Sequence, residues 1–283
     1  MQSENELEKA MKGDINAFHS LFETFKPELK SFLYRLLSDR NLVEDFYHDI
    51  FIKAFDKIKS YKGNSSFKTW CFSIASNSCL DYLRKQKRWS PENKENTKKV
   101  AESTPEIHQA FRKYASTASN GEYEIREHID FCFTCMAKTI EIEKQVAIIL
   151  KDIYQFEVKE IAVVLNYSTS NIKKLLLEGR KTLTTIFDKK CALVNKNGVC
   201  HQCSELNGVF NRKQNQKEEL LKIKLVKEAE KGNKEDLYSL RTELVRNIDP
   251  LNSSGTNLHE LLMDVARYTA GEIKESPFFK LNN

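Results

Sequence analysis

The chain has 283 residues, enough for about two domains of average size. Nine Gly and five Pro residues argue against collagen-like and many-turned all-β folds, and a net charge of +5 does not by itself identify a nucleic-acid-binding protein. The longest apolar runs, such as Val146 to Leu150, are far shorter than the roughly 20 residues that span a bilayer. The polar start, MQSENELEKAMKGD, lacks the pattern of a signal peptide. We therefore expect a cytoplasmic chain without membrane insertion.

Helices are predicted throughout the first 90 residues from the spacing of apolar side chains. Asp14 is placed to cap one of them, and Pro27 suits the first turn of the next. Apolar residues recur every three or four positions over residues 7–25, 29–36, 46–58 and 67–87. Because many of these positions are aromatic, we expect a compact helical domain over residues 5–90.

The composition changes at residues 90–106, which are polar, contain two prolines and show no apolar period. This pattern is typical of a linker, and we expect a flexible one over residues 91–124. Helical periodicity resumes over residues 125–187, followed by a Cys-rich segment at 188–213 and a tail with amphipathic helices at 214–283. The sequence therefore predicts an all-α fold: two helical domains, a flexible linker and a helical C-terminal tail.

Residues 156–183 have the pattern of a helix-turn-helix. Asn166 lies where the turn needs a residue that tolerates left-handed backbone angles, and Ser168 is placed to cap the second helix. A helical hairpin in a bundle has the same pattern, so the motif alone leaves DNA binding open. The polar residues near the start of the second helix, where a recognition helix meets the major groove, are Thr169, Ser170, Asn171, Lys173 and Lys174.

A basic cluster ends the first domain. It consists of Arg84, Lys85, Lys87 and Arg88, and Trp89 follows directly. Cations beside an aromatic ring suit phosphate contact and base stacking. A solvated helix end is the commoner explanation of an isolated cluster, so this signal needs support from elsewhere in the chain.

That support comes from two longer strings. SSFKTWCFSIASNSCLDYLRKQKR (residues 65–88), preceded by VEDFYHDIFIKAF (residues 43–55), resembles the second conserved region of bacterial RNA polymerase sigma factors of the extracytoplasmic-function (ECF) group. The helix-turn-helix lies where the fourth region of these factors is expected, so the resemblance covers residues 5–90 and 130–187. It implies a subunit that binds core RNA polymerase, directs it to specific promoters and promotes DNA-templated transcription initiation.

The resemblance also implies roles for two sets of residues. Those implied in binding the polymerase are Glu44, Asp45, Phe46, His48 and Asp49. Those implied in binding promoter DNA are Lys68, Trp70, Ser73, Asn77, Arg84, Lys85, Arg88, Thr169, Ser170, Asn171, Lys173, Lys174 and Arg180.

Some positions depart from the family pattern. His48 stands where glutamine is usual, and Trp70 fits a core anchor as well as a base-stacking residue. In the recognition helix, Leu175, Leu177 and Glu178 replace polar or basic residues. The recognition helix therefore offers fewer phosphate contacts, and the family's minus-thirty-five preference does not transfer.

The cysteines form two pairs with CxxC spacing, one on each side of the helix-turn-helix. Cys132, Cys135, Cys200 and Cys203 together match the ligand set of a structural zinc site. A redox-responsive thiol pair and plain reduced cysteines are the other two explanations, and all three stay open. The resemblance implies no required cofactor.

Two other functions compete with the sigma factor. A stand-alone helix-turn-helix repressor or activator leaves the first domain unexplained, and a thiol redox enzyme lacks a βαβ context. The sequence contains no P-loop, HExxH or nucleophile elbow, so we expect no enzyme. The tail either packs on the chain's own helices or restrains the DNA-facing domains, in place of or beside a separate anti-sigma factor.

Overall fold

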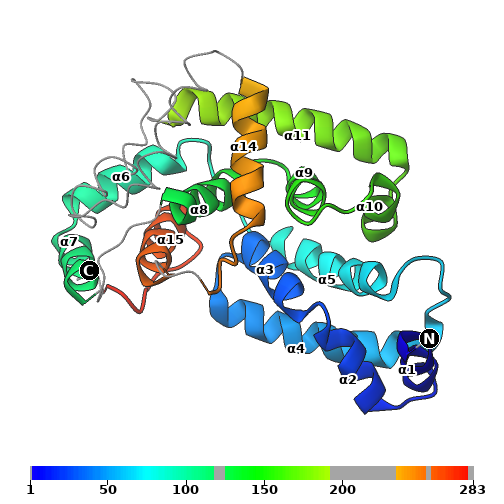
Figure 1. The fold of residues 1–283 in the computed structure, drawn as a ribbon. Helices are drawn as coiled ribbons and strands as arrows, with labels where there is room; N and C mark the ends of the chain where they lie inside the picture. The colour runs from blue at the N-terminus through cyan, green and yellow to red at the C-terminus, as the bar shows by residue number, and fades with distance from the viewer. Residues whose placement is uncertain (1, 118–124, 192–233, 253–255, 280–283) are drawn as a thin grey trace. The chain divides into compact units, whose positions relative to one another are not determined.

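A computed structural model describes residues 2–117, 125–191, 234–252 and 256–279 (Figure 1). The described residues form helices and connecting turns, with no β-strand among them, which confirms the predicted all-α class. None of the described helices is long and apolar enough to cross a membrane. The chain divides into two compact units, Met1–Gln86 with Ile142–Glu178 and Lys87–Glu141 with Gly179–Asn283.

The first unit begins with short helices separated by well-defined ends. The stretch of residues 7–25 is divided at Gly13, just before the predicted cap Asp14, and the φ of +100° at Gly13 is readily adopted only by glycine. Asp14 accepts hydrogen bonds from the Asn16 and Ala17 amides and so caps the next helix. The helices of this part are α1 (Gln2–Met11), α2 (Ile15–Glu23), α3 (Lys26–Leu37), α4 (Arg40–Lys57), the 3₁₀ turn η1 (Ile58–Ser60) and α5 (Phe67–Leu83).

Aromatic side chains fill the core between these helices. Phe22 packs edge-on against Phe51 with ring centroids 5.2 Å apart, and Phe18 and Phe32 are fully buried. Aromatic pairs at such separations stabilise a core beyond the area that they bury. The expected aromatic core is therefore present.

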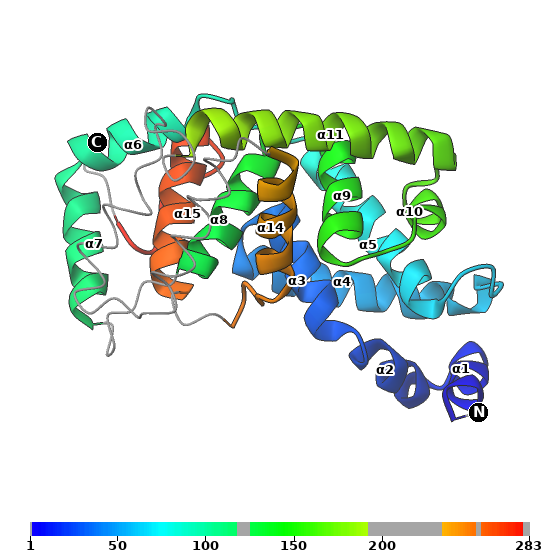
Figure 2. The ribbon, with the colours of Figure 1, turned by 45° about the horizontal axis from the view of Figure 1, so that its top comes forward.

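The second part of the first unit contains the helix-turn-helix. Asn166 has a φ of 54°, and the Ser168 hydroxyl accepts a 3.2 Å hydrogen bond from the Asn171 amide, as the sequence predicts. Ile161 of the first helix and Ile172 and Leu176 of the second are all buried. The helices are α9 (Ile142–Ile148), the π-helical turn η2 (Ile149–Ile153), α10 (Val158–Leu165) and α11 (Thr169–Lys190), and Figure 2 shows α9 and α10 beside α5.

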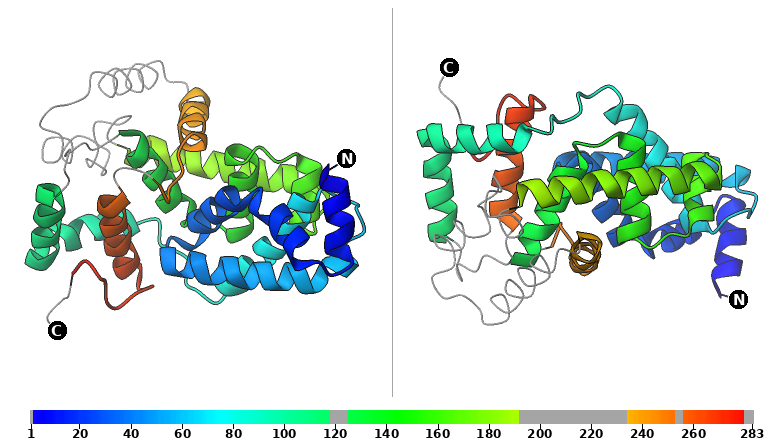
Figure 3. Two further views of the ribbon diagram at one scale, coloured as in Figure 1. Left: turned by 60° about the horizontal axis from the view of Figure 1, so that its bottom comes forward. Right: turned by 90° about the horizontal axis from the view of Figure 1, so that it is seen from above.

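The second unit combines the segment before α9 with the C-terminal part of the chain. Its helices, besides the end of α11, are α6 (Asn93–Ser103), α7 (Pro105–Thr117), α8 (Ile125–Ala137), α14 (Lys234–Arg246) and α15 (Thr256–Ala270). Helix α15 packs on α6, α7 and α8, and Figure 3 shows it next to them. Helix α14 packs on α8.

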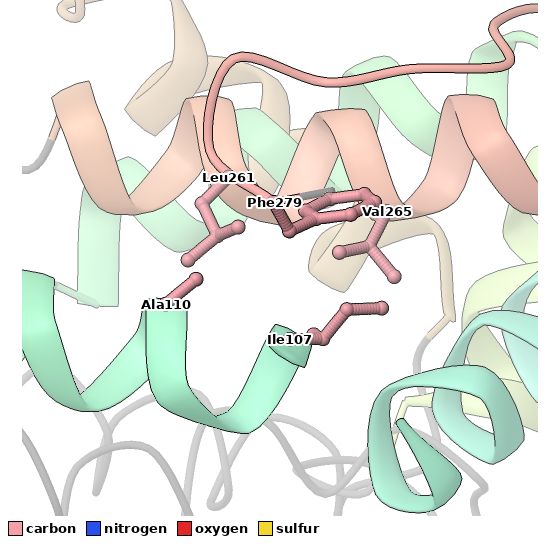
Figure 4. Packing of buried hydrophobic residues seen from close by; sticks show 5 residues of the cluster. All are labelled: Ile107, Ala110, Leu261, Val265 and Phe279. Carbon is pink, nitrogen blue, oxygen red and sulfur yellow. The ribbon is translucent and has the colours of Figure 1, made fainter. Parts of the chain in front are cut away.

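Two of these helices lie where the sequence predicts a flexible linker. Ile107 and Ala110 of α7 are buried against Leu261, Val265 and Phe279 from the C-terminal part of the chain (Figure 4). Because the apolar partners are about 150 positions further along, the short apolar stripe of residues 100–111 does not stand out locally. The linker is therefore helical over residues 93–103 and 105–117.

Candidate nucleic-acid interface

Helix α4 presents an acidic face to solvent. Asp45, His48 and Asp49 are exposed, while Phe46 is half-buried and lies edge-on to Tyr82, with ring centroids 5.4 Å apart. Glu44 is exposed and accepts a 2.7 Å hydrogen bond from Lys30 Nζ. The acidic face of α4 is negatively charged, and contacts with Tyr82 and Lys30 hold it in place. Such a face suits a positively charged protein surface.

One residue of this face was missed by the sequence analysis. Ile52 lies one turn beyond Asp49 on α4, and its side chain is 56% exposed. An apolar side chain beside carboxylates matches the composition of interface centres, in which a few apolar anchors are ringed by polar groups. The helical spacing from Asp45 and Asp49 was the signal that could have identified it.

Helix α5 carries a second stripe of candidate residues. Trp70, Ser73 and Asn77 follow one another at helical spacing and share one face of α5, and the C-cap residue Arg84 continues the same spacing. The Trp70 ring is half-buried against Tyr61, at a centroid distance of 5.4 Å, while Asn77 is exposed. The stripe joins an aromatic surface to hydrogen-bonding groups and a cation, which is the combination that holds unpaired bases.

Lys68 lies at the start of α5, beside this stripe. Its ammonium donates a 2.6 Å hydrogen bond to Glu28 Oε1 and lies 5.2 Å from the ring centroid of Phe156. Lys68 is therefore engaged by a carboxylate and an aromatic face rather than extended into solvent.

The cations at the end of α5 have separate environments. Arg84 Nη2 donates a 3.0 Å hydrogen bond to Glu143 Oε1, and this bond raises the pKa of Arg84. Lys85 is exposed. Arg88 is half-buried. Its Nη2 group donates hydrogen bonds to the carbonyl oxygens of Ala137 at 3.1 Å and Ile140 at 2.6 Å. Its guanidinium thus satisfies carbonyls at the end of α8.

The start of α11 exposes the residues expected of a recognition helix, namely Thr169, Ser170, Asn171, Lys173 and Lys174. Arg180 is half-buried further along the helix. Glu178 forms ion pairs with two lysines, and Lys144 Nζ lies 3.1 Å and Lys174 Nζ 3.9 Å from its carboxylate oxygens. The hydrogen bond from Lys144 holds the pKa of Glu178 below its usual value. Leu177 is 72% exposed, so the helix presents an apolar and an acidic residue among its cations.

The predicted zinc ligands lie partly outside the described residues. Cys200 and Cys203 fall there, whereas Cys132 is half-buried and Cys135 is buried on α8, its sulfur 3.9 Å from Met263 Sδ. Among the described residues, no group of three or more His, Cys, Asp or Glu side chains could hold a metal ion. Burial raises the pKa of the Cys71 thiol, so this residue is a neutral core side chain.

Comparison with known proteins gives a family-model match and relatives that each cover part of this chain. The family model for sigma-70 region 2 matches residues 21–88. The ECF RNA polymerase sigma factor SigX of Bacillus subtilis (strain 168) is 26% identical over 176 residues, covering 59% of this chain and 81% of that protein. The corresponding factor SigW of the same strain is 25% identical over 187 residues, covering 65% and 95%.

A third relative matches over a shorter stretch. The ECF RNA polymerase sigma-E factor of Haemophilus influenzae is 36% identical over 85 residues, covering 30% of this chain and 44% of that protein. Among solved structures, CnrH in complex with the cytosolic domain of CnrY is 18% identical with a TM-score of 0.45, covering 65% of this chain and 95% of that one.

Proposed function

The chain belongs to the ECF group of RNA polymerase sigma factors, and we propose that it binds core RNA polymerase, directs it to specific promoters and promotes transcription initiation. The observation that carries the proposal is the match of residues 21–88 to sigma-70 region 2, in which α4 and α5 expose two different faces. The chain acts by binding rather than by chemistry, since it supplies contacts that position the polymerase and stabilise melted DNA.

Each face has its own part in this function. The acidic face of α4, with Asp45, Asp49 and Ile52, binds the polymerase. The stripe of α5 holds the unpaired strand, with Trp70 as the stacking surface and Asn77 as a hydrogen-bonding group. Opening a duplex costs a few kcal/mol per base step, which stacking and cation contacts on the single strand offset.

The start of α11 reads the duplex upstream of the melted region. Thr169, Ser170 and Asn171 are exposed at its N-terminal end, where side chains of a recognition helix reach base edges. Lys173 contacts a phosphate, whereas Lys174 is paired with Glu178 on the same helix. Because the polymerase is cytoplasmic, this function places the chain in the cytoplasm.

Run-off transcription with purified core polymerase over a pool of genomic promoter fragments tests the proposal. We expect discrete transcripts that depend on the chain, and their loss when Asp45 and Asp49 are both replaced by Lys, because the α4 face then repels its partner. The control is Glu8→Lys, an exposed carboxylate on α1 that lies outside the α4 face. No chain-dependent transcript, together with tight duplex binding by the free chain, would identify a stand-alone repressor or activator instead.

A structural zinc ion held by Cys132, Cys135, Cys200 and Cys203 is a separate proposal, and transcription initiation does not require it. Thiolates hold zinc well, and CxxC spacing supplies two ligands with little strain. Metal analysis of protein purified without a histidine tag should give about one zinc per chain. Absence of metal, with all four thiols freely titratable in the folded protein, would contradict the site.

A further inference from the structure

One strongly exposed apolar side chain lies on the recognition helix α11. Leu177 is 72% exposed, the highest fraction among the large apolar side chains in the described part of the chain. Single apolar residues are common on protein surfaces, so exposure alone carries no function. Ile172 is fully buried and Leu176 is 5% exposed, which shows that α11 has a separate face for the core. Leu177 does not belong to that core face.

Helical geometry places Leu177 in the middle of the outer face of α11. Each residue of an α-helix turns by about 100°, so Ser170 and Leu177, seven positions apart, point within about 20° of each other. Lys173 and Lys181, four positions before and after Leu177, lie about 40° to either side of it. These three neighbours are exposed as well. Leu177 therefore lies between two cations on the face that starts with the polar first turn.

The charges beside Leu177 fit DNA better than an apolar protein surface. Lys173 and Lys181 suit the phosphates of a DNA backbone, whereas an apolar partner would desolvate both ammonium groups without pairing them. Lys174, also on this face, forms its ion pair with Glu178 at 3.9 Å. The major groove is about 12 Å wide and admits an α-helix. In such a groove, the lysines reach phosphates and the side chain between them reaches base edges.

An apolar side chain distinguishes one base from the other three in the major groove. Thymine presents its C5-methyl group there, whereas adenine, guanine and cytosine present hydrogen-bond donors or acceptors. The Leu177 side chain has neither a donor nor an acceptor, so it leaves the polar groups of those three bases unpaired. Contact with a methyl group, in contrast, buries apolar surface on both partners.

We propose that Leu177 is a specificity-determining residue of the recognition helix, and that it selects a thymine in the upstream promoter element through contact with the C5-methyl group. This inference rests on the proposed function and deepens it, because it names a base that α11 prefers. Leu177 supplies base readout, while Lys173 and Lys181 contact the phosphates beside it. The family pattern has polar or basic residues at this position, so the preference is a property of this chain.

Deoxyuridine tests the contact, because uracil differs from thymine in the major groove only by lacking the methyl group. Promoter duplexes that support chain-dependent transcription are compared with duplexes in which the thymines of the upstream element are replaced, one at a time, by deoxyuridine. Binding of polymerase reconstituted with the full chain is measured by competition. At one position, loss of the methyl group should weaken binding about fourfold, the factor that one buried methyl group contributes.

Two variants assign that difference to Leu177. Leu177→Ala should bind the thymine and uracil duplexes equally, because the shortened side chain no longer reaches the methyl group, and its exposed position leaves the core intact. The control is Val163→Ala, since Val163 is 49% exposed on α10, outside the recognition helix. With this control the fourfold difference should persist.

Three results would overturn the inference: an upstream element without thymine, equal binding of the thymine and uracil duplexes by the unchanged chain, or a difference that survives Leu177→Ala. Weaker binding of Leu177→Ala to polymerase, with no effect of uracil, would assign Leu177 to a protein contact instead. A complex that shows no chain-dependent binding to promoter duplex would refute the proposed function itself, and this inference with it.

Discussion

The Trp89 indole Nε1 donates a 2.7 Å hydrogen bond to Glu272 Oε1, which joins the end of region 2 to the C-terminal part of the chain inside the second unit. The same carboxylate accepts a 3.0 Å hydrogen bond from Lys138 Nζ, and the Lys138 ammonium lies 4.8 Å from the Trp89 ring centroid. Arg267 Nε lies 3.5 Å from Glu272 Oε2. Glu272 therefore connects three segments through one buried charge network.

Replacing Glu272 by Gln should destabilise the second unit strongly. Lys138 is 2% exposed, and burial lowers its pKa while Glu272 opposes that effect. Removing the carboxylate leaves the ammonium in a low-dielectric site, a change that costs about 3 kcal/mol of unfolding free energy. Urea unfolding is followed by Trp89 fluorescence in a Trp70→Phe background, where Trp89 is the one remaining tryptophan of two.

Glu275→Gln is the control for this measurement, because Glu275 is exposed three residues further along the chain. We expect it to change the unfolding free energy by less than about 0.5 kcal/mol. Equal losses for the two variants would show that net charge, and not the contact with Lys138, stabilises the unit.

Local features of the fold were predictable from sequence because they depend on neighbouring residues. Apolar spacing gave the helices, and turn chemistry gave the left-handed Asn166 and the cap at Ser168. Which helices pair is not encoded locally. Ile107 could not be recognised as a core residue, because its partner Leu261 lies 154 positions further along the chain.

In the candidate site too, features that depend on neighbouring residues were predictable, whereas contacts between residues far apart in the sequence were not. The exposed residues of α4 and α11 could be predicted, since family pattern and helical spacing both locate them on a surface. The environments of Arg84 and Arg88 could not, because Glu143 and the carbonyl oxygens of Ala137 and Ile140 reach them only through tertiary structure. A basic residue in a sequence reveals its charge but not the acceptor that takes its hydrogen bonds.

The stability of the second unit should depend on pH through His259. Burial lowers the pKa of His259 from 6.5 to about 3, with a further contribution from His128, whose ring centroid is 6.4 Å away. Between these two pKa values the unfolded chain binds a proton that the folded chain does not, so stability falls as the pH falls. The expected loss from His259 between about pH 6.5 and about pH 5 is about 2 kcal/mol.

Urea unfolding at about pH 7.5 and about pH 5, again followed by Trp89, measures this dependence. His259→Phe should remove most of the slope, because it removes the titrating group and fills the space beside Phe131, whose ring lies 5.8 Å away. His48→Gln, on the exposed face of α4, should leave the slope unchanged. A slope that survives His259→Phe would assign the dependence to other groups.

Trp70→Ala should impair promoter opening more than polymerase binding. The Trp70 ring is half-buried between Tyr61 and Phe67 at the edge of the aromatic core, with one part left for a base. Loss of one stacked base weakens the open complex about tenfold. Permanganate reactivity of the melted thymines measures opening, and Trp70→Phe, which keeps a ring, is the control. Normal opening by the alanine variant would leave Trp70 as a core residue only.

Tyr154→Phe should destabilise the first unit. The hydroxyl that contacts Ser31 and accepts from Arg35 is removed, while the ring stays against Phe32, 5.9 Å away. Loss of an acceptor for a buried guanidinium costs about 2 kcal/mol of unfolding free energy. Unfolding followed by Trp70 fluorescence in a Trp89→Phe background reports this unit. Tyr167→Phe, at a 40% exposed position, is the comparison, and a loss of the same size there would contradict the role of the Tyr154 hydroxyl.

Glu178→Gln should strengthen promoter binding through the recognition helix and make it more sensitive to salt. Glu178 forms ion pairs with Lys144 and with Lys174, its neighbour one turn earlier on α11. Without the carboxylate, Lys174 is released toward the phosphates and the negative charge on the DNA-facing helix is gone. One additional phosphate contact steepens the slope of log K against log salt by about 0.9.

The measurement is binding of the reconstituted polymerase complex to promoter duplex over a series of salt concentrations. Glu102→Gln is the matched control, since Glu102 forms an i,i+4 pair with Lys98 at 3.6 Å on α6. An unchanged slope for Glu178→Gln, or the same steepening for Glu102→Gln, would show that Lys174 gains no phosphate when Glu178 is neutralised.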